Sequence, residues 1–332
     1  MVVVAGLLGV QVGNYQFIQE IFPKFRAAPS LAGVLATVVK WIPLALIAGA
    51  VVVMPSHFGL TTWTIAGSTL VLLLALRLGM AMRFLRLMRL VKPAGSRLVG
   101  LVSAVAQRMN MPPPKAWVFA SPVANAYAAV VTRELLFTQG IMDHLSDTEI
   151  AAICAHELGH LSEPRRLVYL RVIQSMLLFP LVFLKPLMSL GGVGGPYALG
   201  LVALVLLAAG RLRRMGQRME TRADAIATAN QSEPTVYARA LEHLYQVNQM
   251  PAVMPNRRKQ RHPDLYDRLI AAGITPDFPR PNPPRRFTQA GWIMFFIFIA
   301  LVIIANGHAS FHESMSWRQA SSSQHPPPAT PP

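Results

Sequence analysis

Three long apolar runs constrain the fold of this chain more than any other feature. They cover residues 31–54, 62–82 and 287–305. A helix needs about 20 apolar residues to cross the hydrocarbon core of a bilayer, and each run reaches that length. Hydrophobic residues make up 53% of the sequence and charged residues only 14%, which is too apolar for an ordinary soluble domain. The sequence therefore predicts an integral membrane protein with several spans.

Two shorter apolar stretches predict a helical hairpin in the middle of the chain. They cover about residues 167–184 and 196–210, and a glycine-rich turn at residues 191–195 joins them. The first stretch contains Arg171 and Pro180, so we expect its charged side chain to extend toward the interface and its helix to bend. Full crossing is the expectation, and partial, re-entrant insertion is the alternative.

The sequence HELGH at residues 156–160 is an HExxH motif. A Ser-x-x-Glu pattern at residues 146–149 predicts a capped helix that starts just before the motif. On a helix, His156 and His160 lie one turn apart on the same face, where both imidazoles can bind one Zn²⁺. Glu157 is then expected to be the general base for the attacking water. The alternative, two surface histidines beside a solvated glutamate, fits this capped helix less well.

A zinc ion held by two histidines and a water lacks one protein ligand for tetrahedral coordination. Downstream of the motif, Glu220 and Asp224 lie one helical turn apart. We expect Glu220 to be the third ligand and Asp224 to hydrogen-bond a ligand histidine. Without the motif, the two acids would be interpreted as ion-pair partners of the neighbouring Arg214, Arg218 and Arg222. The motif favours the ligand interpretation, with one Zn²⁺ per chain.

Four segments resemble the membrane gluzincin metallopeptidases, a family that includes the bacterial heat-shock protease HtpX and the eukaryotic CAAX prenyl protease. These segments are residues 148–160, Glu220 with Asp224, Asn125-Ala126-Tyr127, and His262-Pro263 followed by Arg268. Their order and spacing also agree, so the resemblance covers about residues 95–270. Two features depart from the family pattern: the tyrosine at position 127, where phenylalanine is commoner, and a fifth apolar segment that the four-span heat-shock type lacks.

The resemblance implies roles for the remaining candidate residues. The strand that carries Asn125, Ala126 and Tyr127 would bind the substrate as an added strand, with the Asn125 amide holding a substrate carbonyl. His262 and Arg268 would donate to the oxyanion that forms at the scissile carbonyl, or would hold Asp224 in place. The alternatives are a turn asparagine at position 125 and a solvated basic surface around positions 262 and 268.

The predicted fold is α+β and mostly α-helical: a multi-span integral membrane protein with a zincin-like metalloprotease domain that carries a small β-sheet. Strands are expected at residues 116–120, 126–132 and 135–138, and helices at 97–109, 145–163, 213–229 and 235–247. The single cysteine, Cys154, is expected to lie in the core and excludes an internal disulfide.

The expected domain organisation alternates membrane and catalytic parts. It comprises an N-terminal segment (1–30), two transmembrane helices (31–92), a catalytic part with the strands and the HExxH helix (93–166), a transmembrane hairpin (167–210), a second catalytic part with the third zinc ligand (211–286), a C-terminal transmembrane helix (287–306) and a disordered Pro/Ser-rich tail (307–332).

Basic residues cluster on one side of the predicted spans. The clusters are Arg83, Arg86, Arg89 and Lys92, then Arg165 and Arg166, then Arg211, Arg213 and Arg214, and finally Arg285 and Arg286. The positive-inside rule makes that side cytoplasmic, which places the catalytic domain at the cytoplasmic face of a bacterial inner (plasma) membrane. The clusters also suit contact with an anionic lipid bilayer. The formal net charge is +16, but no nucleic-acid recognition module is visible, so no nucleic acid is expected as a partner.

Together these features predict a zinc-dependent membrane endopeptidase that cleaves membrane, misfolded or unfolded proteins, with zinc and Glu157 activating the water. The alternatives are a catalytically idle zinc-binding membrane scaffold, a CAAX-type processing protease, and a metallohydrolase with a substrate other than peptide. A structural zinc site normally has four protein ligands, often cysteines, whereas three ligands are expected here. This count favours an enzyme. The sequence assigns no oligomeric state.

Overall fold

The computed structural model describes residues 31–252 and 263–281. It divides into two compact units. Among the described residues, the first unit consists of residues 31–44, 72–176, 210–252 and 263–281, and the second unit consists of residues 45–71 and 177–209. The predicted apolar run at 287–305, the predicted tail at 307–332 and the N-terminal segment at 1–30 all lie outside the described residues.

Three helical segments in the described part of the chain are long and apolar enough to cross a membrane. They are Leu60–Leu87, Arg165–Met188 and Gly194–Ala229. The first matches the apolar run predicted at 62–82, and the other two match the predicted hairpin. Helix α2 (Leu31–Val53) coincides with the apolar run predicted at 31–54.

Two of these segments are interrupted, each at a residue that disfavours a regular helix. In the first, helix α3 (Leu60–Ala75) passes through the π-helical turn η1 (Leu76–Met80) into α4 (Ala81–Leu87), and Gly79 within η1 has a φ of +111°. In the second, α8 (Arg165–Ser175) gives way to the 3₁₀ turn η2 (Phe179–Phe183), which contains Pro180. Glycine tolerates the positive φ, and proline cannot donate the hydrogen bond that a continuing helix needs.

The hairpin continues from η2 through short turns into one long helix. Helix α9 (Leu184–Met188) is followed by the 3₁₀ turn η3 (Gly191–Val193) and then by α10 (Gly194–Ala229). Two separate helices at 196–210 and 213–229 were predicted, and the structure corrects this. No proline follows the apolar part of α10, and the Arg, Met and Gln residues beyond it are good helix formers, so the helix continues to the predicted ligand Glu220.

A four-stranded mixed sheet lies in the first unit, in the order β1-β2-β4-β3. The strands are β1 (Val91–Pro93), β2 (Lys115–Phe119), β3 (Ala126–Ala129) and β4 (Glu134–Thr138). Strands β2 and β4 pair in parallel, whereas β1 pairs with β2 and β3 with β4 in antiparallel fashion. Three strands were predicted and β1 was not. Strand β3 ends three residues earlier than predicted, because the chain turns there toward Arg133, whose φ is +53°.

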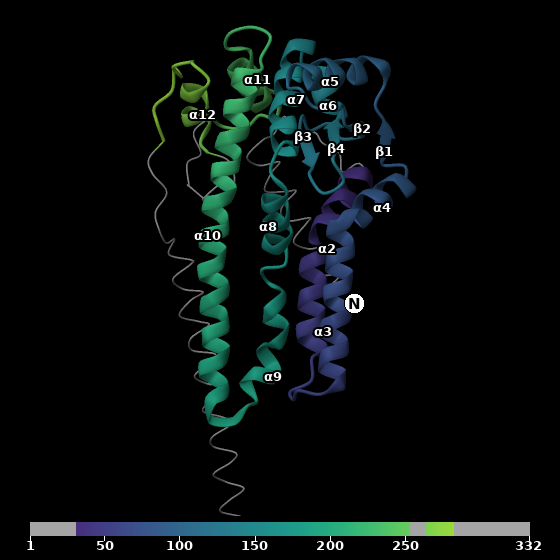
Figure 1. Ribbon diagram of the computed structural model, residues 1–332, viewed down its shortest axis with the longest axis vertical. Helices are drawn as coiled ribbons and strands as arrows, with labels where there is room; N and C mark the ends of the chain where they lie inside the picture. The colour runs from purple at the N-terminus through teal and green to yellow at the C-terminus, as the bar shows by residue number, and fades with distance from the viewer. Residues whose placement is uncertain (1–30, 253–262, 282–332) are drawn as a thin grey trace, which may run out of the picture. The chain divides into compact units, whose positions relative to one another are not determined.

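Helices pack around this sheet and enclose the core. They are α5 (Ser96–Arg108), α6 (Gln139–His144), α7 (Asp147–Leu161), α11 (Val236–Val247) and α12 (Leu265–Ala271). Helix α7, which carries the HExxH motif, contacts α5, α11 and strand β3 (Figure 1). Every residue of α7 from Ile150 to Leu161 is buried. The predicted fold class, mostly helical with a small sheet and membrane-length helices, is therefore confirmed.

The start of α7 follows from its first residues. The Ser146 backbone N–H donates to Glu149 Oε2 at 2.8 Å, and the Glu149 backbone N–H donates to Ser146 Oγ at 3.4 Å. This reciprocal pair is the predicted capping box, and it satisfies two N–H groups that the helix itself leaves unpaired. Cys154 lies in the core as predicted, and burial raises the pKa of its thiol.

Candidate metal centre

Helices α7 and α10 approach closely at Gly159, in the first unit. A Cβ atom on Gly159 would lie 3.2 Å from the Cα of Ala223 on α10. Ala223 and Ala227 are themselves buried. Small residues on both helices thus allow their backbones to come together. This contact brings the acids of α10 to the histidines of α7, although 60 or more positions separate them in the sequence.

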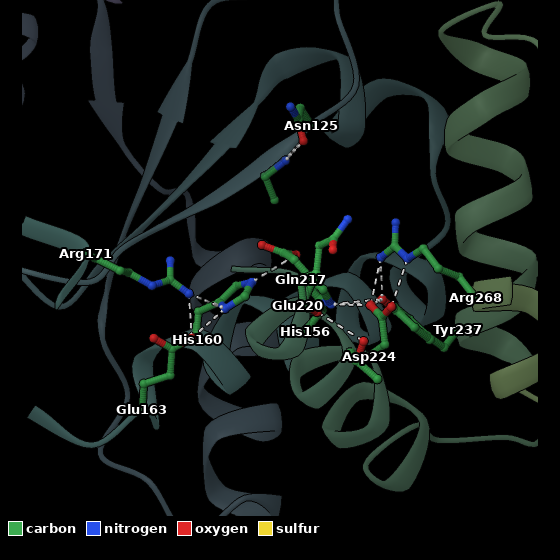
Figure 2. A network of polar contacts seen from close by, with 12 residues as sticks. Asn125, His156, His160, Glu163, Arg171, Gln217, Glu220, Asp224, Tyr237 and Arg268 are labelled. Carbon is green, nitrogen blue, oxygen red and sulfur yellow. Dashed lines mark hydrogen bonds and ion pairs between the residues drawn. The ribbon is translucent and has the colours of Figure 1, made fainter. Parts of the chain in front are cut away.

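Three predicted ligand residues meet at this contact: His156, His160 and Glu220 (Figure 2). Each offers one ligand atom, and the three atoms lie within 4.8 Å of one another. Glu220 Oε2 lies 3.6 Å from His156 Nε2 and 3.5 Å from His160 Nε2. Tetrahedral bonds of about 2.0–2.1 Å place neighbouring ligand atoms about 3.3 Å apart. The donor set and its spacing therefore fit a zinc ion.

The first histidine is held from its other nitrogen by a buried network (Figure 2). His156 Nδ1 lies 3.0 Å from Asp224 Oδ1 and 2.9 Å from the Tyr237 hydroxyl oxygen. The Tyr237 hydroxyl donates to Asp224 Oδ1 at 2.6 Å. Arg268 donates to both carboxylate oxygens of Asp224, at 2.9 and 2.8 Å, and to Tyr237 at 2.9 Å. This arrangement keeps Nδ1 protonated and leaves Nε2 as the metal-facing nitrogen.

The second histidine is held in the same way by different residues. The Nδ1 of His160 lies 2.9 Å from Glu163 Oε1, and Arg171 donates to the same carboxylate oxygen at 2.5 Å. Sequence reasoning missed both Glu163 and Tyr237 as site residues. Glu163 lies three positions after the motif, which is the spacing that allows a contact along one helix face. Tyr237 carried no comparable signal, because its contact with His156 spans 81 positions.

The electrostatics of the cluster suit a cation. Burial lowers the pKa of His156, but its contacts with the Asp224 and Glu220 carboxylates outweigh burial and raise that pKa above its ordinary value. Burial likewise lowers the pKa of His160, and contacts with Glu163 and Glu220 raise it to about 9. Buried carboxylates that favour a proton on each ring also favour a metal ion in its place, because metal binding releases those protons.

Glu157 and the predicted substrate strand lie near the ligands. Glu157 is buried. Partial burial raises the pKa of the Tyr127 hydroxyl, a hydrogen bond from Asn125 lowers it, and the negative charge of Glu157 raises it further. Tyr127 is about half exposed and Ala126 is buried. Within the described sheet, β3 pairs only with β4 and forms its edge. The expected position of a substrate strand is therefore beside Glu157.

Asn125 is engaged within the chain itself. Its side-chain Oδ1 accepts a hydrogen bond from the Ala126 backbone N–H at 2.9 Å, and its Nδ2 donates to the Tyr127 hydroxyl at 2.7 Å. Its backbone N–H and carbonyl both bond to Thr138. Figure 2 shows Asn125 apart from the ligand cluster. The Asn125 amide was predicted to hold a substrate carbonyl. In the structure it is bonded to the Ala126 backbone N–H of its own strand.

Two roles were predicted for Arg268 and His262: donation to the oxyanion and support of Asp224. The contacts of Arg268 are with Asp224 and Tyr237, and only 8% of its surface is exposed. These contacts match the supporting role. His262 lies outside the described residues.

Comparisons with known proteins identify the family of this chain. The model of peptidase family M48 matches residues 95–273, more than half of the chain. A "Protease HtpX homolog" of Desulforapulum autotrophicum is 27% identical over 164 residues, which cover 44% of this chain and 52% of that protein. The proteins of the same name from Trichormus variabilis and Aeropyrum pernix are 29% and 31% identical, over 45% and 46% of this chain and 56% and 53% of their own lengths. The chain thus spans about half the length of the curated relatives it matches. The matched region contains the motif helix α7, strands β2, β3 and β4, and Glu220. This chain belongs to peptidase family M48.

Proposed function

We propose that this protein is a zinc-dependent membrane endopeptidase, with one Zn²⁺ held by His156, His160 and Glu220. The observation that carries the proposal is the convergence of these three side chains within 4.8 Å of one another. Three protein ligands leave a tetrahedral ion one open position, which is the arrangement of a catalytic rather than a structural zinc site. Its membership of family M48 supports the same class of activity.

The chemistry of peptide hydrolysis is divided between the ion and Glu157. A zinc ion held by His156, His160 and Glu220 would polarise the scissile carbonyl and would make water acidic enough to deprotonate near neutral pH. Glu157 accepts the proton of the attacking water as the water oxygen bonds to the carbonyl carbon. When the carbon–nitrogen bond breaks, Glu157 passes the proton to the leaving amine. Its buried position beside the ligands suits transfer over this short path.

Strand β3 is proposed to bind the substrate by strand addition. An edge strand offers unpaired backbone groups to an extended peptide, and alternate side chains then face the catalytic helix. Asn125 would leave the Ala126 N–H, which it covers in the free protein, and turn its amide to a substrate carbonyl. Tyr127 would contact the substrate from its exposed position on the same strand.

We also propose that Asp224 and Arg268 hold the His156 ring in its ligand orientation. Asp224 accepts from the Nδ1 side of that ring, and Arg268 neutralises Asp224. A carboxylate behind a ligand histidine fixes the orientation of the ring and raises its basicity. We assign Arg268 to this supporting role, and His262 to donation to the oxyanion.

The substrate class is proposed to be membrane proteins and misfolded or unfolded proteins at the cytoplasmic face of a bacterial inner membrane. The helices long enough to cross a bilayer support a membrane setting. In the sequence, the segment Arg165–Met188 directly follows the motif, and the segment Gly194–Ala229 contains Glu220. The metal centre is therefore proposed to form at the membrane surface. The predicted division into alternating membrane and catalytic parts belongs to this proposal.

The decisive test is cleavage by the intact protein in detergent. The protein is treated with a chelator, reloaded with Zn²⁺, and assayed on an unfolded model protein and on itself. Glu157→Gln is expected to retain zinc and to lose at least about 100-fold in turnover, because removal of the general base affects proton transfer alone. The control is Glu233→Gln, which changes an exposed carboxylate in the same way.

The outcomes separate the proposed enzyme from its alternatives. Zinc-dependent cleavage that Glu157→Gln lacks and Glu233→Gln keeps would support the endopeptidase. Zinc bound by the wild-type protein without cleavage of either substrate would instead favour the idle scaffold. A prenylated peptide is assayed as a third substrate, and its cleavage without cleavage of the other two would favour the CAAX-type protease.

A further inference from the structure

Arg171 is a charged residue inside a segment long and apolar enough to cross a membrane. It lies on α8, within the segment Arg165–Met188. An ionisable side chain in such a segment is costly unless it is paired, and its partner indicates its role. We expected this side chain to extend toward the membrane interface. In the structure it extends to the metal centre, where it contacts Glu163 and His160.

The partner of Arg171 is Glu163, which in turn contacts the ligand His160 (Figure 2). The side chain of Glu163 is only 1% exposed and that of Arg171 is 21% exposed. Since His160 turns Nε2 toward Glu220, its Nδ1 carries the hydrogen and donates to Glu163 Oε1. Arg171 Nη2 donates to the same oxygen and lies 3.0 Å from His160 Nδ1. Two donors therefore converge on one carboxylate oxygen.

The arrangement is poorly suited to a purely stabilising role. Among the described residues, no hydrogen-bond partner reaches Glu163 Oε2 or Arg171 Nε, although both atoms are buried. Burying an ion pair removes two charges from water, and apolar side chains of similar volume are often as stable or more stable at such a position. An apolar pair would, however, offer no acceptor for His160 Nδ1, which Glu163 Oε1 provides.

We propose that Arg171 is a positioning residue for the His160 metal ligand and acts through Glu163. The inference rests on the proposed zinc site and goes beyond its ligands. Arg171 holds the carboxylate of Glu163 at Nδ1 of His160, so that Nε2 stays directed at the metal. The helix that enters the membrane hairpin thereby fixes one ligand of the metal centre, and loss of the arginine loosens that ligand.

Replacement of Arg171 should speed the loss of metal, while His156, His160 and Glu220 remain the ligands. Residues that orient a ligand histidine typically change metal affinity by about 10–100-fold when they are replaced. We expect Arg171→Ala to fall in this range, and Arg171→Lys, which keeps the charge, to recover part of the loss. Glu163→Gln keeps an acceptor at Nδ1 but removes the charge, so its loss should be smaller than that of Glu163→Ala.

The experiment uses the full-length protein in detergent, loaded with Zn²⁺ or with Co²⁺. The rate at which a chelator removes zinc reports how fast the ion dissociates, and competition with the chelator at equilibrium reports zinc affinity. The visible absorption spectrum of the cobalt form reports ligand geometry. Arg166→Ala is the matched control, since Arg166 is an exposed arginine of the same helix. Thermal unfolding of the metal-free proteins shows whether each variant is folded. The combination of Arg171→Ala and Arg171→Lys keeps the test valid if the alanine variant unfolds.

Support would be faster zinc loss and an altered cobalt spectrum in Arg171→Ala, partial recovery in Arg171→Lys, and wild-type behaviour in Arg166→Ala. Zinc loss within about twofold of the wild type, with an unchanged cobalt spectrum in both Arg171 variants, would overturn the inference and leave the proposed function intact. Failure of the wild-type protein to bind either metal would overturn both.

Discussion

Tyr237 joins the parts of the candidate site that come from three different helices. Its hydroxyl oxygen lies 2.9 Å from His156 Nδ1, donates to Asp224 at 2.6 Å and accepts from Arg268 at 2.9 Å. The side chain is completely buried. A buried tyrosine hydroxyl needs a partner, and this one has three that are charged or bind the metal. Tyr237 therefore helps to fix the positions of Asp224 and Arg268 beside His156.

We predict that Tyr237→Phe lowers the free energy of unfolding by about 1–3 kcal/mol, because charged partners lose a buried hydrogen bond while the ring still fills its place. Zinc should also be removed faster by a chelator. The measurements are thermal unfolding and metal loss in detergent. Tyr169→Phe, the same change at an exposed tyrosine, is the control. Equal effects of the two changes would contradict this role of Tyr237.

The ligand residues were accessible to sequence reasoning, whereas their supports were not. A fixed four-residue spacing predicts that His156 and His160 share a helix face, and the scarcity of acids drew attention to Glu220. The prediction that Asp224 faces a ligand histidine matches its observed position, 3.0 Å from His156 Nδ1. Contacts such as Tyr237 with His156 depend on tertiary packing, for which local sequence carries no periodic signal.

At the scale of elements, the site depends on how closely α7 and α10 pack. The position of Gly159 against Ala223 sets the distance between the two histidines and Glu220. Ala223 and Ala227 are buried at this contact, so a larger side chain at Gly159 would press on the α10 backbone. The geometry of the metal centre is thus a property of a helix pair.

We predict that Gly159→Val abolishes stoichiometric zinc binding, because its side chain would push α10 away and separate Glu220 from the histidines. Overpacking of this kind costs about 1–3 kcal/mol, so the fold should survive while the site does not. Zinc content of the purified variant is the measurement. Gly100→Val on α5 is the control, since nothing lies within 4 Å of a Cβ at that position. Full zinc content in Gly159→Val would disprove the importance of this contact.

Most elements were predicted from periodicity and turn residues, and the failures have physical causes. Strand β1 is short and contains Lys92 and Pro93, so its strand character comes from pairing with β2 rather than from its own sequence. The continuity of α10 was missed because its sequence changes from apolar to charged within one helix. A change of environment from membrane to protein alters composition without ending the helix.

At the scale of the whole molecule, we propose that the metal centre lies at the cytoplasmic face of the membrane and that the chain crosses the membrane to the turn of the hairpin. The basic clusters next to the spans support this orientation. Orientation is a property of the chain in its bilayer, and the distribution of basic residues predicts it. Labelling of single cysteines provides the test.

We predict that Val193→Cys, in the turn of the hairpin, reacts with a membrane-impermeant thiol reagent in intact bacterial cells. Ser232→Cys, exposed beyond the end of α10, should react only after permeabilisation. The native Cys154 is buried, with a raised pKa, and should remain unreactive in both proteins. The opposite labelling pattern would reverse the proposed orientation, and an unreactive Val193→Cys in intact cells would indicate a hairpin that does not cross.

The proposed function depends on a zinc ion bound by two histidines and a glutamate. Zinc content together with X-ray absorption at the zinc edge tests this on the purified full-length protein. We predict about one zinc per chain, with nitrogen and oxygen ligands at about 2.0–2.2 Å and no sulfur ligand, and loss of the ion in Glu220→Ala. A sulfur ligand, or zinc retained at full stoichiometry in a His156→Ala, His160→Ala double variant, would contradict it.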